Sequence, residues 1–353
     1  MAVLDPARLA DLLHAVELPT TDEEIWRYSR IGELDPSSFR PRPLAPELSG
    51  PTVGVEVGGD VVDLFPDDTP DVFAEINRSG ADQVRIVVPA GRAIEAPIVI
   101  THRVPGDGSL VCPRLVIEAG ADSEVTVVEM FVSEGEQSSL VVPVLQISAD
   151  AAARVNYLGV NELNTRTWSI GHQQSMGERD SSLLLATVAL GGDYARVRTE
   201  AKVVGRGAST RQVALYFAGG DQMHDFRTIQ DHAAPHGSSD LLFKGAVQDT
   251  AASVYTGLIL IREDADGTAA YQTNRNLTLS EGAWAESVPN LDIRTNDVKC
   301  AHASTVGPID ADQRFYLESR GVRPAVAERL VVLGFFDEVL AQLPSVEATS
   351  DLR

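Results

Sequence analysis

About two hundred consecutive residues, from about 98 to 295, carry strand-type patterns and no apolar repeat of helical length. In the stretch YARVRTEAKV, residues 194–203, alanine and β-branched residues alternate with charged residues at every second position. Alternation with a period of two is typical of a strand with one buried face. Because parallel strands in ordinary sheets need helical crossovers, this region excludes a βαβ fold and predicts an all-β core.

The strand-type segments of this core, placed at residues 98–304, begin repeatedly at short turns of small residues. Examples are AGADSEVTVVEMFV, ADAAARVNYLGV, GGDYARVRTEAKVVG, RGASTRQVALYFAGG, DTAASVYTGLILI and EGAWAESVPNLDI. A sandwich, a propeller and a β-solenoid all remain open on this pattern. The loosely repeated units of turn and strand favour a solenoid of stacked coils. A solenoid has open ends that need cover, and helices at both chain ends would suit that role.

The segments before the core predict two regions. Residues 1–52 form a helical region and a linker, with a helical apolar spacing at Leu9, Leu12, Leu13 and Val16. Five prolines within 35–52 argue against regular structure in the linker. Residues 53–97 form a mixed lead-in, with a hairpin that turns at Gly58 and Gly59 and a short helix near 71–77.

The region after the core, residues 305–353, predicts two helices. Asp310 is a candidate N-cap, Gly321 suits the end of the first helix, and Pro324 suits the start of the second. Apolar residues then recur at steps of three and four: Val326, Leu330, Leu333, Phe336, Leu340 and Leu343. This stripe packs on the body of the protein or offers a ridge or groove to a partner.

The charge balance limits the partners. The chain has 353 residues, and 51 acidic against 29 basic side chains give a net charge of −22. Such a surface repels phosphate backbones, which argues against nucleic acid as a partner. No apolar run approaches the ~18 residues of a membrane span, and the N-terminal residues lack the pattern of a secretory signal. We expect a cytoplasmic protein that does not enter the membrane.

Motifs for nucleotide hydrolysis and common hydrolase chemistry do not occur. The sequence contains no GxxxxGK[ST], GxSxG, HExxH or CxxC, so we expect no nucleotide on this chain. Cys112 lies in an apolar strand context and is expected to act as a small buried hydrophobe. His224, His232 and His236 are expected to be buried, hydrogen-bonded histidines in turns, and a metal or proton-transfer role is the alternative.

Cys300 and His302 form the most chemically suggestive pair in the chain. In an extended strand both side chains lie on one face, about 7 Å apart. Thiolate and imidazole together suit zinc, iron or an iron–sulfur cluster, and Lys299 would favour the thiolate. Closed metal sites usually have four ligands, and only two are local here. The site is therefore incomplete, or another chain completes it.

Two long stretches resemble a known family. They are HDFRTIQDHAAPHGSSDLLFKGAVQDTAASVYTGLILI and AAYQTNRNLTLSEGAWAESVPNLDIRTNDVKCAHASTVGPIDADQRFYLESRGV. Over about residues 221–340 the chain resembles the SufB/SufD family of iron–sulfur cluster assembly proteins. The segment EEIWRYSRI and the length of the chain fit the SufD members better than the longer SufB members.

This resemblance implies a fold and a set of partners. The fold is mainly β, with a right-handed parallel β-helix core flanked by N-terminal and C-terminal helical regions. The function is that of a non-catalytic scaffold subunit, which pairs with a SufB-like paralogue and binds a SufC-like ATPase. A homodimer is expected when the chain is alone. The ATPase would bind at about residues 305–340, including Phe315, Tyr316, Arg320 and Gly321.

The resemblance also gives the ligand pair a context. The family's Lys-Cys-Ser-His-Gly-Ala-Thr element reads KCAHAST here, so His302 is the candidate ligand for a transient iron or iron–sulfur cluster at a heterodimer interface, with Cys300 beside it. Ala301, Ala303 and Ser304 depart from the family pattern. Two alternatives stay open: a β-helix enzyme that acts on carbohydrates, and a purely structural partner in which both residues only pack.

Overall fold

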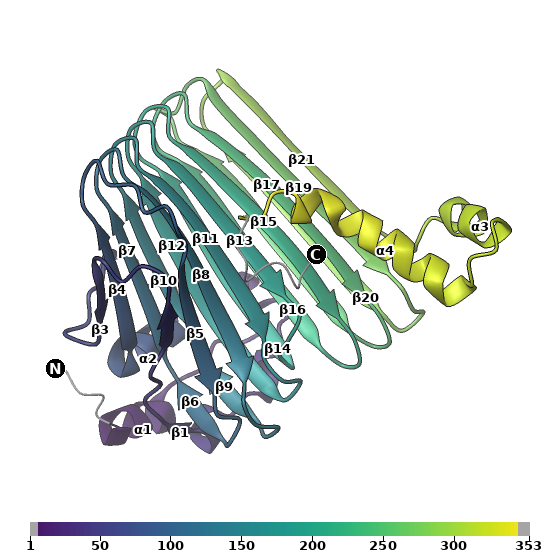
Figure 1. The fold of residues 1–353 in the computed structure, drawn as a ribbon, viewed down its shortest axis with the longest axis horizontal. Coiled ribbons are helices and arrows are strands. Elements are labelled where there is room, and N and C mark those ends of the chain that lie inside the picture. The colour runs from purple at the N-terminus through teal and green to yellow at the C-terminus, as the bar shows by residue number, and fades with distance from the viewer. Residues whose placement is uncertain (1–5, 345–353) are drawn as a thin grey trace.

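The structure is a computed structural model that describes residues 6–344. Its body is a flattened β-solenoid of about eight coils, built from two parallel sheets that face each other (Figure 1). One sheet contains β4 (Asp82–Val88), β7 (Pro113–Ala119), β10 (Val144–Ala149), β12 (Thr167–Gly177), β14 (Tyr194–Val203), β16 (Met223–His232), β18 (Ala252–Ile261) and β20 (Trp284–Ile293). The other contains β5 (Ile98–Val104), β8 (Glu124–Ser133), β11 (Arg154–Glu162), β13 (Ser182–Ala189), β15 (Ser209–Ala218), β17 (Ser238–Val247), β19 (Thr268–Thr278) and β21 (Val298–Gly307). We call them sheet A and sheet B, and the predicted β-helix class is confirmed.

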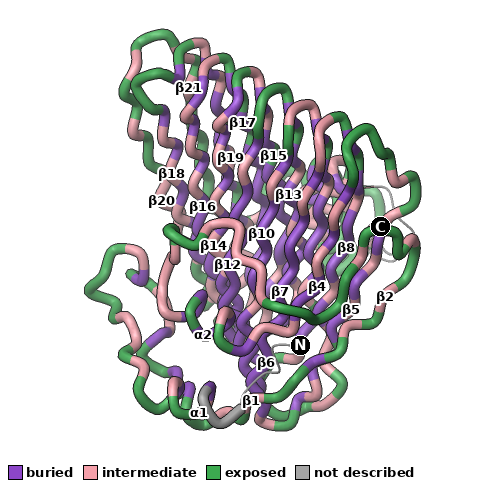
Figure 2. Tube along the Cα trace, turned by 90° about the vertical axis from the view of Figure 1, so that its left-hand side faces the viewer, coloured by how far each residue is buried: buried purple, intermediate pink, exposed green. Residues whose placement is uncertain are grey.

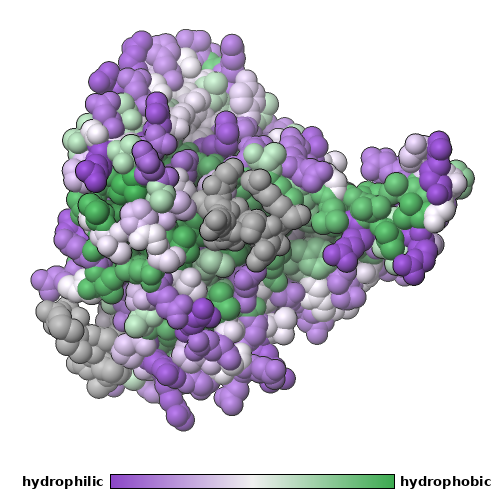
Figure 3. All heavy atoms as spheres, viewed as in Figure 1, coloured by the Kyte–Doolittle hydropathy of each residue, from purple (hydrophilic) through white to green (hydrophobic). Residues whose placement is uncertain are grey.

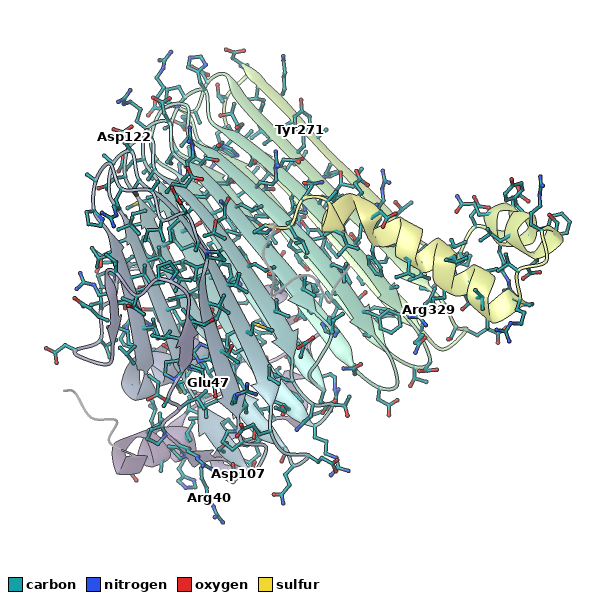
Figure 4. All side chains as sticks on the ribbon, in the orientation of Figure 1. Arg40, Glu47, Asp107, Asp122, Tyr271 and Arg329 are labelled. Carbon is teal, nitrogen blue, oxygen red and sulfur yellow. The ribbon has the colours of Figure 1, made fainter. Side chains whose placement is uncertain are left out.

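Small-residue turns set the corners between the sheets. Non-glycine residues adopt positive φ at several of them, including Asp122 at 57° and Asp180 at 58°. Asp122 lies at the upper left corner in Figure 4. A short polar side chain tolerates this left-handed backbone better than a branched one does. The coil length varies, because Arg154 pairs with Ser182, whereas Ser238 pairs with Ala269 three coils further on. This variation explains why the repeat is degenerate in the sequence.

The interior of the solenoid changes character along the stack. In the first coils the inward side chains are aliphatic, including Leu115, Ile117, Leu145 and Ile147. From β12 onward many inward positions are polar and buried: Gln173, Ser175, Thr199, Gln212, His224, Thr228, Gln230, His232, Ser239, Ser253, Gln272, Asn274 and Asn276. We call this set the polar interior. The alternation in the sequence locates the inward positions. The polarity of the side chains at these positions distinguishes the coils before β12 from the later coils.

The N-terminal region packs on the outer face of sheet A. It contains α1 (Pro6–Ala15), three single turns of 3-10 helix, η1 (Glu24–Trp26), η2 (Ile31–Glu33) and η3 (Pro36–Ser38), and later α2 (Val72–Gly80). Trp26 is fully buried between Phe73 and the guanidinium of Arg196, whose Cζ lies 4.0 Å from the indole ring centroid. Cys112 is 1% exposed in the same cluster, as expected for a small buried hydrophobe. The contact of Trp26 with Phe73 and Arg196 fixes the N-terminal segment on the strands of sheet A.

Two predictions for the region before the core are wrong. The predicted hairpin at Gly58 and Gly59 does not form, because β3 (Val55–Val57) pairs antiparallel with β4. The predicted linker is not free of regular structure either. It supplies β1 (Arg40–Pro41), parallel to β6 (Ser109–Val111), and β2 (Glu47–Ser49), antiparallel to β5. Prolines are compatible with such short edge strands, because an edge strand leaves some backbone groups unpaired. β6 also pairs with β9 (Ser139–Val141).

The helices do not cover the ends of the solenoid, contrary to expectation. At the first end, β3 and β2 add antiparallel strands to the two sheets. At the last end, β20 pairs only with β18 and β21 only with β19 within the described chain. Figure 2 shows that burial fades toward these last two strands. The N-terminal helices lie on one outer face, and the C-terminal helix lies on the other.

The C-terminal helices form a projecting arm. Asp310 caps α3 (Ala311–Ser319) by accepting hydrogen bonds from the backbone of residues 312 and 313. Gly321 then takes a φ of +86° before α4 (Pro324–Leu340) begins. The predicted apolar stripe is divided: Phe336, Leu340 and Leu343 pack on sheet B, whereas Val326, Leu330 and Leu333 are exposed. Figure 1 shows why, since only the end of α4 lies over the sheet. Residues 345–353 of the predicted region, like 1–5, lie outside the described chain.

No helix in the described part of the chain is long and apolar enough to cross a membrane.

One buried lysine joins the arm to the solenoid, and its removal should loosen α4. Lys244 on β17 donates to the carbonyl of Phe335 at 2.8 Å, pairs with Glu338 at 2.7 Å, and lies 4.8 Å from the Phe335 ring centroid. Its side chain is only 5% exposed. We expect Lys244→Ala to destabilise the docking of α4 by about 2–3 kcal/mol, because it leaves a carbonyl and a carboxylate without their donor. Hydrogen exchange of α4 measures the effect.

Lys202→Ala is the matched control for this prediction. Lys202 lies on β14 of the opposite sheet and forms no ion pair with any described residue. Its variant should leave exchange in α4 unchanged. Equal protection of α4 in both variants would show that Lys244 does not fasten the arm.

Candidate functional site

The uncovered last coil is the most unusual surface of the molecule. Each of its strands, β20 and β21, is ten residues long and has one unpaired edge in the described structure. Side chains at inward positions, which earlier coils bury, are open here: Leu291, Ile293 and Val306 are 40–43% exposed. Long unpaired edges and exposed apolar side chains are features that soluble proteins normally cover. The last coil therefore has the properties of an interface.

Cys300 and His302 lie on this coil, both at inward positions of β21. Cys300 pairs in register with Ala270 and packs against Ile259 and Ile261, while His302 pairs with Gln272 and is exposed. The alternation places both side chains on the same face, as the sequence predicts. The two residues therefore differ in exposure, with the thiol half-covered and the imidazole open to the last end of the stack.

The expected effect of Lys299 on the thiol is wrong. Lys299 alternates to the outer face of β21, away from Cys300, and burial raises the pKa of Cys300 above the ordinary value. The thiol is therefore protonated at neutral pH in the free chain. A metal that binds there must displace this proton.

The pair does not form a complete metal site on its own. No group of three or more His, Cys, Asp or Glu side chains within residues 6–344 is arranged to hold a metal ion. Iron and zinc sites with four protein ligands therefore need at least two further ligands from elsewhere. Open imidazole, half-buried thiol and unpaired strand edges all face the same end of the solenoid. This geometry suits a site that a second chain completes.

The arm carries a second uncovered apolar surface. Phe315 and Tyr316 on α3 are 70% and 59% exposed, and the Arg320 guanidinium lies 5.2 Å from the Tyr316 ring centroid. A groove of about 900 Å³ between α3 and α4 is lined by Tyr316, Leu317, Leu330 and Phe335, among others. Figure 3 shows hydrophobic residues along this arm where it stands clear of the body. We call Phe315, Tyr316 and this groove the arm surface.

Comparison with known families places the chain in one of them. The model of the SufBD core domain of the SUF system for iron–sulfur cluster assembly matches residues 102–335, about two thirds of the chain. The chain belongs to the SufBD family. The matched range contains the last coil, both candidate ligands and most of the arm. The expected assignment to this family is confirmed.

Curated relatives match over 73–96% of this chain. An iron–sulfur cluster assembly SufBD family protein of Mycobacterium tuberculosis is 32% identical over 96% of this chain and 88% of its own length. The iron–sulfur cluster assembly protein SufD of Escherichia coli is 26% identical over 92% of this chain and 85% of its own length. The SufD protein of Bacillus subtilis is 28% identical over 73% of this chain.

The polar interior of this SufBD protein was not recognised from the sequence. Below His302, Gln272 donates to the Tyr255 hydroxyl, and that hydroxyl lies 3.0 Å from Thr228 Oγ1. Polar atoms of Gln212, His224, Gln230 and Gln272 are buried and have no hydrogen-bond partner in the described structure. When polar residues alternate with apolar ones on a strand, the polar residues are normally assigned to the solvent face. Buried polar positions are therefore missed in the sequence. Internal water is the usual partner of buried polar atoms like these.

The three clustered histidines occupy different environments from those expected. His224 and His232 are buried as expected, but they lie in the strand β16 rather than in turns. His232 Nε2 lies 2.8 Å from Ser239 Oγ, whereas neither ring nitrogen of His224 has a partner among described residues. Only His236 lies at a turn, where it is exposed and has a φ of 60°. The prediction of turns was wrong for His224 and His232 because the turn begins only after His232, at the end of β16.

Proposed function

We propose that this SufBD protein is the SufD-like, non-catalytic scaffold subunit of a SufBCD-type complex. Its last coil would pair with a SufB-like paralogue, and its arm surface would hold a SufC-like ATPase. The single observation that carries the proposal is the uncovered last coil, where unpaired strand edges and exposed apolar side chains surround two potential ligands. Relatives named SufD that align along most of the chain support the same role.

The proposed interface brings together two incomplete ligand sets. A second SufBD chain that stacks its own last strands against β20 and β21 would pair the open backbone edges and bury Leu291, Ile293 and Val306. His302 and Cys300 would then face ligands of the partner. Iron or a nascent iron–sulfur cluster is the cargo of this site. Cys300 binds it as thiolate and releases its proton to solvent, while His302 binds through a neutral ring nitrogen.

The arm would connect ATP hydrolysis on a partner to this interface. α4 reaches from the exposed groove to sheet B, where Lys244 and the cluster of Phe336, Val339 and Leu343 hold it. A partner that moves the outer part of α4 therefore acts on β15 and β17 through a fixed contact. The nucleotide belongs to the ATPase in this proposal. Family membership favours a scaffold over an enzyme that acts on carbohydrates.

Native mass spectrometry of a co-expressed complex tests the proposal. This chain is co-expressed with SufB-like and SufC-like proteins of the same genome, and the purified complex is weighed. We expect one copy of this chain, one SufB-like chain and two ATPase chains. Phe315→Ser with Tyr316→Ser should remove one ATPase chain and keep the SufB-like chain, because the two aromatic side chains are exposed and support no core contact.

A second double variant separates the two surfaces. Leu291→Asp with Ile293→Asp puts charge on the last coil and should release the SufB-like chain while the ATPase stays bound. Val57→Ser, at an exposed valine of β3 at the other end of the stack, is the control and should change neither contact. A chain that remains alone, or forms only homodimers, in the presence of both partners would sink the proposal.

A further inference from the structure

A cavity on the outer face of sheet A borders the last coil, because Asn290 of β20 is in its lining, and it lies apart from the arm surface. Its volume is about 330 Å³, within the usual size of small-molecule sites. Its lining includes Arg198, Arg227, Thr256 and Asn290, together with residues 24–25 of the N-terminal segment. Arg198, Arg227 and Thr256 are neighbours in register on β14, β16 and β18, so their side chains stand in one row.

Several arginines gather at this cavity, in a chain of net charge −22. Three guanidinium groups, those of Arg196, Arg198 and Arg227, lie near the carboxylates of Asp71, Glu200 and Asp225, and Glu24 also lines the cavity. Arg196 pairs with Asp225, which also accepts a hydrogen bond from Tyr194 at 2.8 Å. Arg198 pairs with Glu200 at 2.6 Å. Asp225 Oδ2 and Glu200 are thus engaged, and one of the three guanidinium groups forms no close ion pair within the described residues.

Arg227 is that unpaired group. The residue is 7% exposed, and it forms no ion pair with any carboxylate in residues 6–344. Its Nη2 donates to the carbonyls of Glu24 at 2.9 Å and Arg27 at 3.3 Å, while its Nε is buried and has no partner in the same range. Burial lowers the pKa of Arg227 to about 10, with Asp225 opposing this effect and Arg196 and Arg198 adding to it, so Arg227 is charged at neutral pH. A buried cation without a close ion-pair partner is costly, and an anion bound against it lowers this cost.

We propose that this cavity is a binding site for a small oxyanion, a molecule with a phosphate or carboxylate group, and that Arg227 is its main contact. Guanidinium groups recognise both anions through charge-assisted hydrogen bonds. Arg198 adds a second cation at the wall, and Thr256 adds a hydroxyl. Because Glu24 and Ile25 form the opposite wall, the bound anion also stabilises the N-terminal segment against sheet A.

Isothermal titration calorimetry of the purified full chain tests the site. Sodium pyrophosphate and sodium succinate are titrated separately at constant ionic strength, which distinguishes phosphate from carboxylate ligands. We expect saturable binding of at least one of them, together with slower hydrogen exchange of residues 24–27. Arg227→Gln should weaken this binding at least about tenfold, because it removes the central charge.

Asn290→Asp keeps the test decisive if the Arg227 variant fails to fold. Asn290 is exposed at the rim, so the substitution adds a negative charge to the cavity and leaves the Arg227 contacts intact. It should also weaken binding at least about tenfold. The control Arg154→Gln removes an exposed arginine on sheet B, with a side chain 69% exposed, and should bind as the wild type does. Absence of saturable binding by both anions, or equal weakening in the control, would overturn the proposal.

Discussion

Replacing His302 by alanine should reduce the iron–sulfur cluster content of the co-expressed complex by about tenfold or more, since even groups that only orient a metal ligand are worth about 10- to 100-fold in affinity. The complex itself should still assemble. His302 is exposed on the last coil and forms no hydrogen bond with any described residue, so its removal costs the fold little. Iron and sulfide analysis of the anaerobically purified complex, with its visible absorption spectrum, measures the effect.

The neighbouring positions supply matched controls for this experiment. Ser304→Ala changes the next inward residue of β21 and should leave the cluster content unchanged. Lys299→Ala changes the outer face of the same strand and should also have no effect, because that side chain points away from the pair. Cys300→Ala should reduce the content as His302→Ala does. Full cluster content in both ligand variants would mean that the two residues only pack against the partner.

Replacing His224 by phenylalanine should make the protein more resistant to acid. His224 is completely buried, stacks with its centroid 6.3 Å from that of Phe226, and has both ring nitrogens unpartnered among described residues. Burial lowers the pKa of His224 to about 4. An aromatic ring without polar atoms should fit the same stack and avoid the desolvation cost, with a gain of about 1–2 kcal/mol at pH 7.

The direction of the pH effect follows from the lowered pKa. Between pH 6.5 and about 4 the unfolded chain binds a proton at His224 and the folded chain does not, so stability falls as the pH falls. The loss approaches roughly 3 kcal/mol near pH 4 and does not grow further, at 1.36 kcal/mol for each pH unit. His232, with its pKa also lowered to about 4, adds a loss of the same sign.

Urea unfolding of the isolated chain between pH 7.5 and 4.5 measures this difference. The wild type should lose stability steeply with acid, and His224→Phe should show a shallower slope. His14→Phe, at an exposed histidine on α1, is the control and should follow the wild type. Parallel curves for the wild type and His224→Phe would show that His224 is not neutral in the folded state.

The core strands were predictable because their signal is local. Alternation and small-residue turns are properties of a few adjacent residues, and each of the six quoted segments forms a strand of the solenoid. The hairpin at Gly58 and Gly59 was wrong because a turn sequence specifies where the chain bends, but not which strand it meets. β3 has its partner, β4, about 30 residues further along the chain.

The candidate site was predictable only in part for the same reason. Cys300 and His302 are two residues apart, so their shared face follows from the period of a strand. Arg198, Arg227 and Asn290 meet only because coils of unequal length stack in one register. That register depends on all the turns between them. The hydrogen bonds of Arg227 depend in addition on the N-terminal segment, which lies about 200 residues away in the sequence.

The change from aliphatic to polar side chains inside the solenoid implies that local stability falls from the first coils to the last. A stack in which each coil touches only its neighbours has a local stability in every coil, so it frays from its weaker end. The first coils hold their shape by burying hydrocarbon, and an antiparallel strand flanks each sheet there. The last coils bury amide and hydroxyl groups among aromatic and aliphatic side chains, and they end in open edges. In the proposed complex, a docked partner would complete the folding of this end, and limited proteolysis of the free chain should cut first in these last coils.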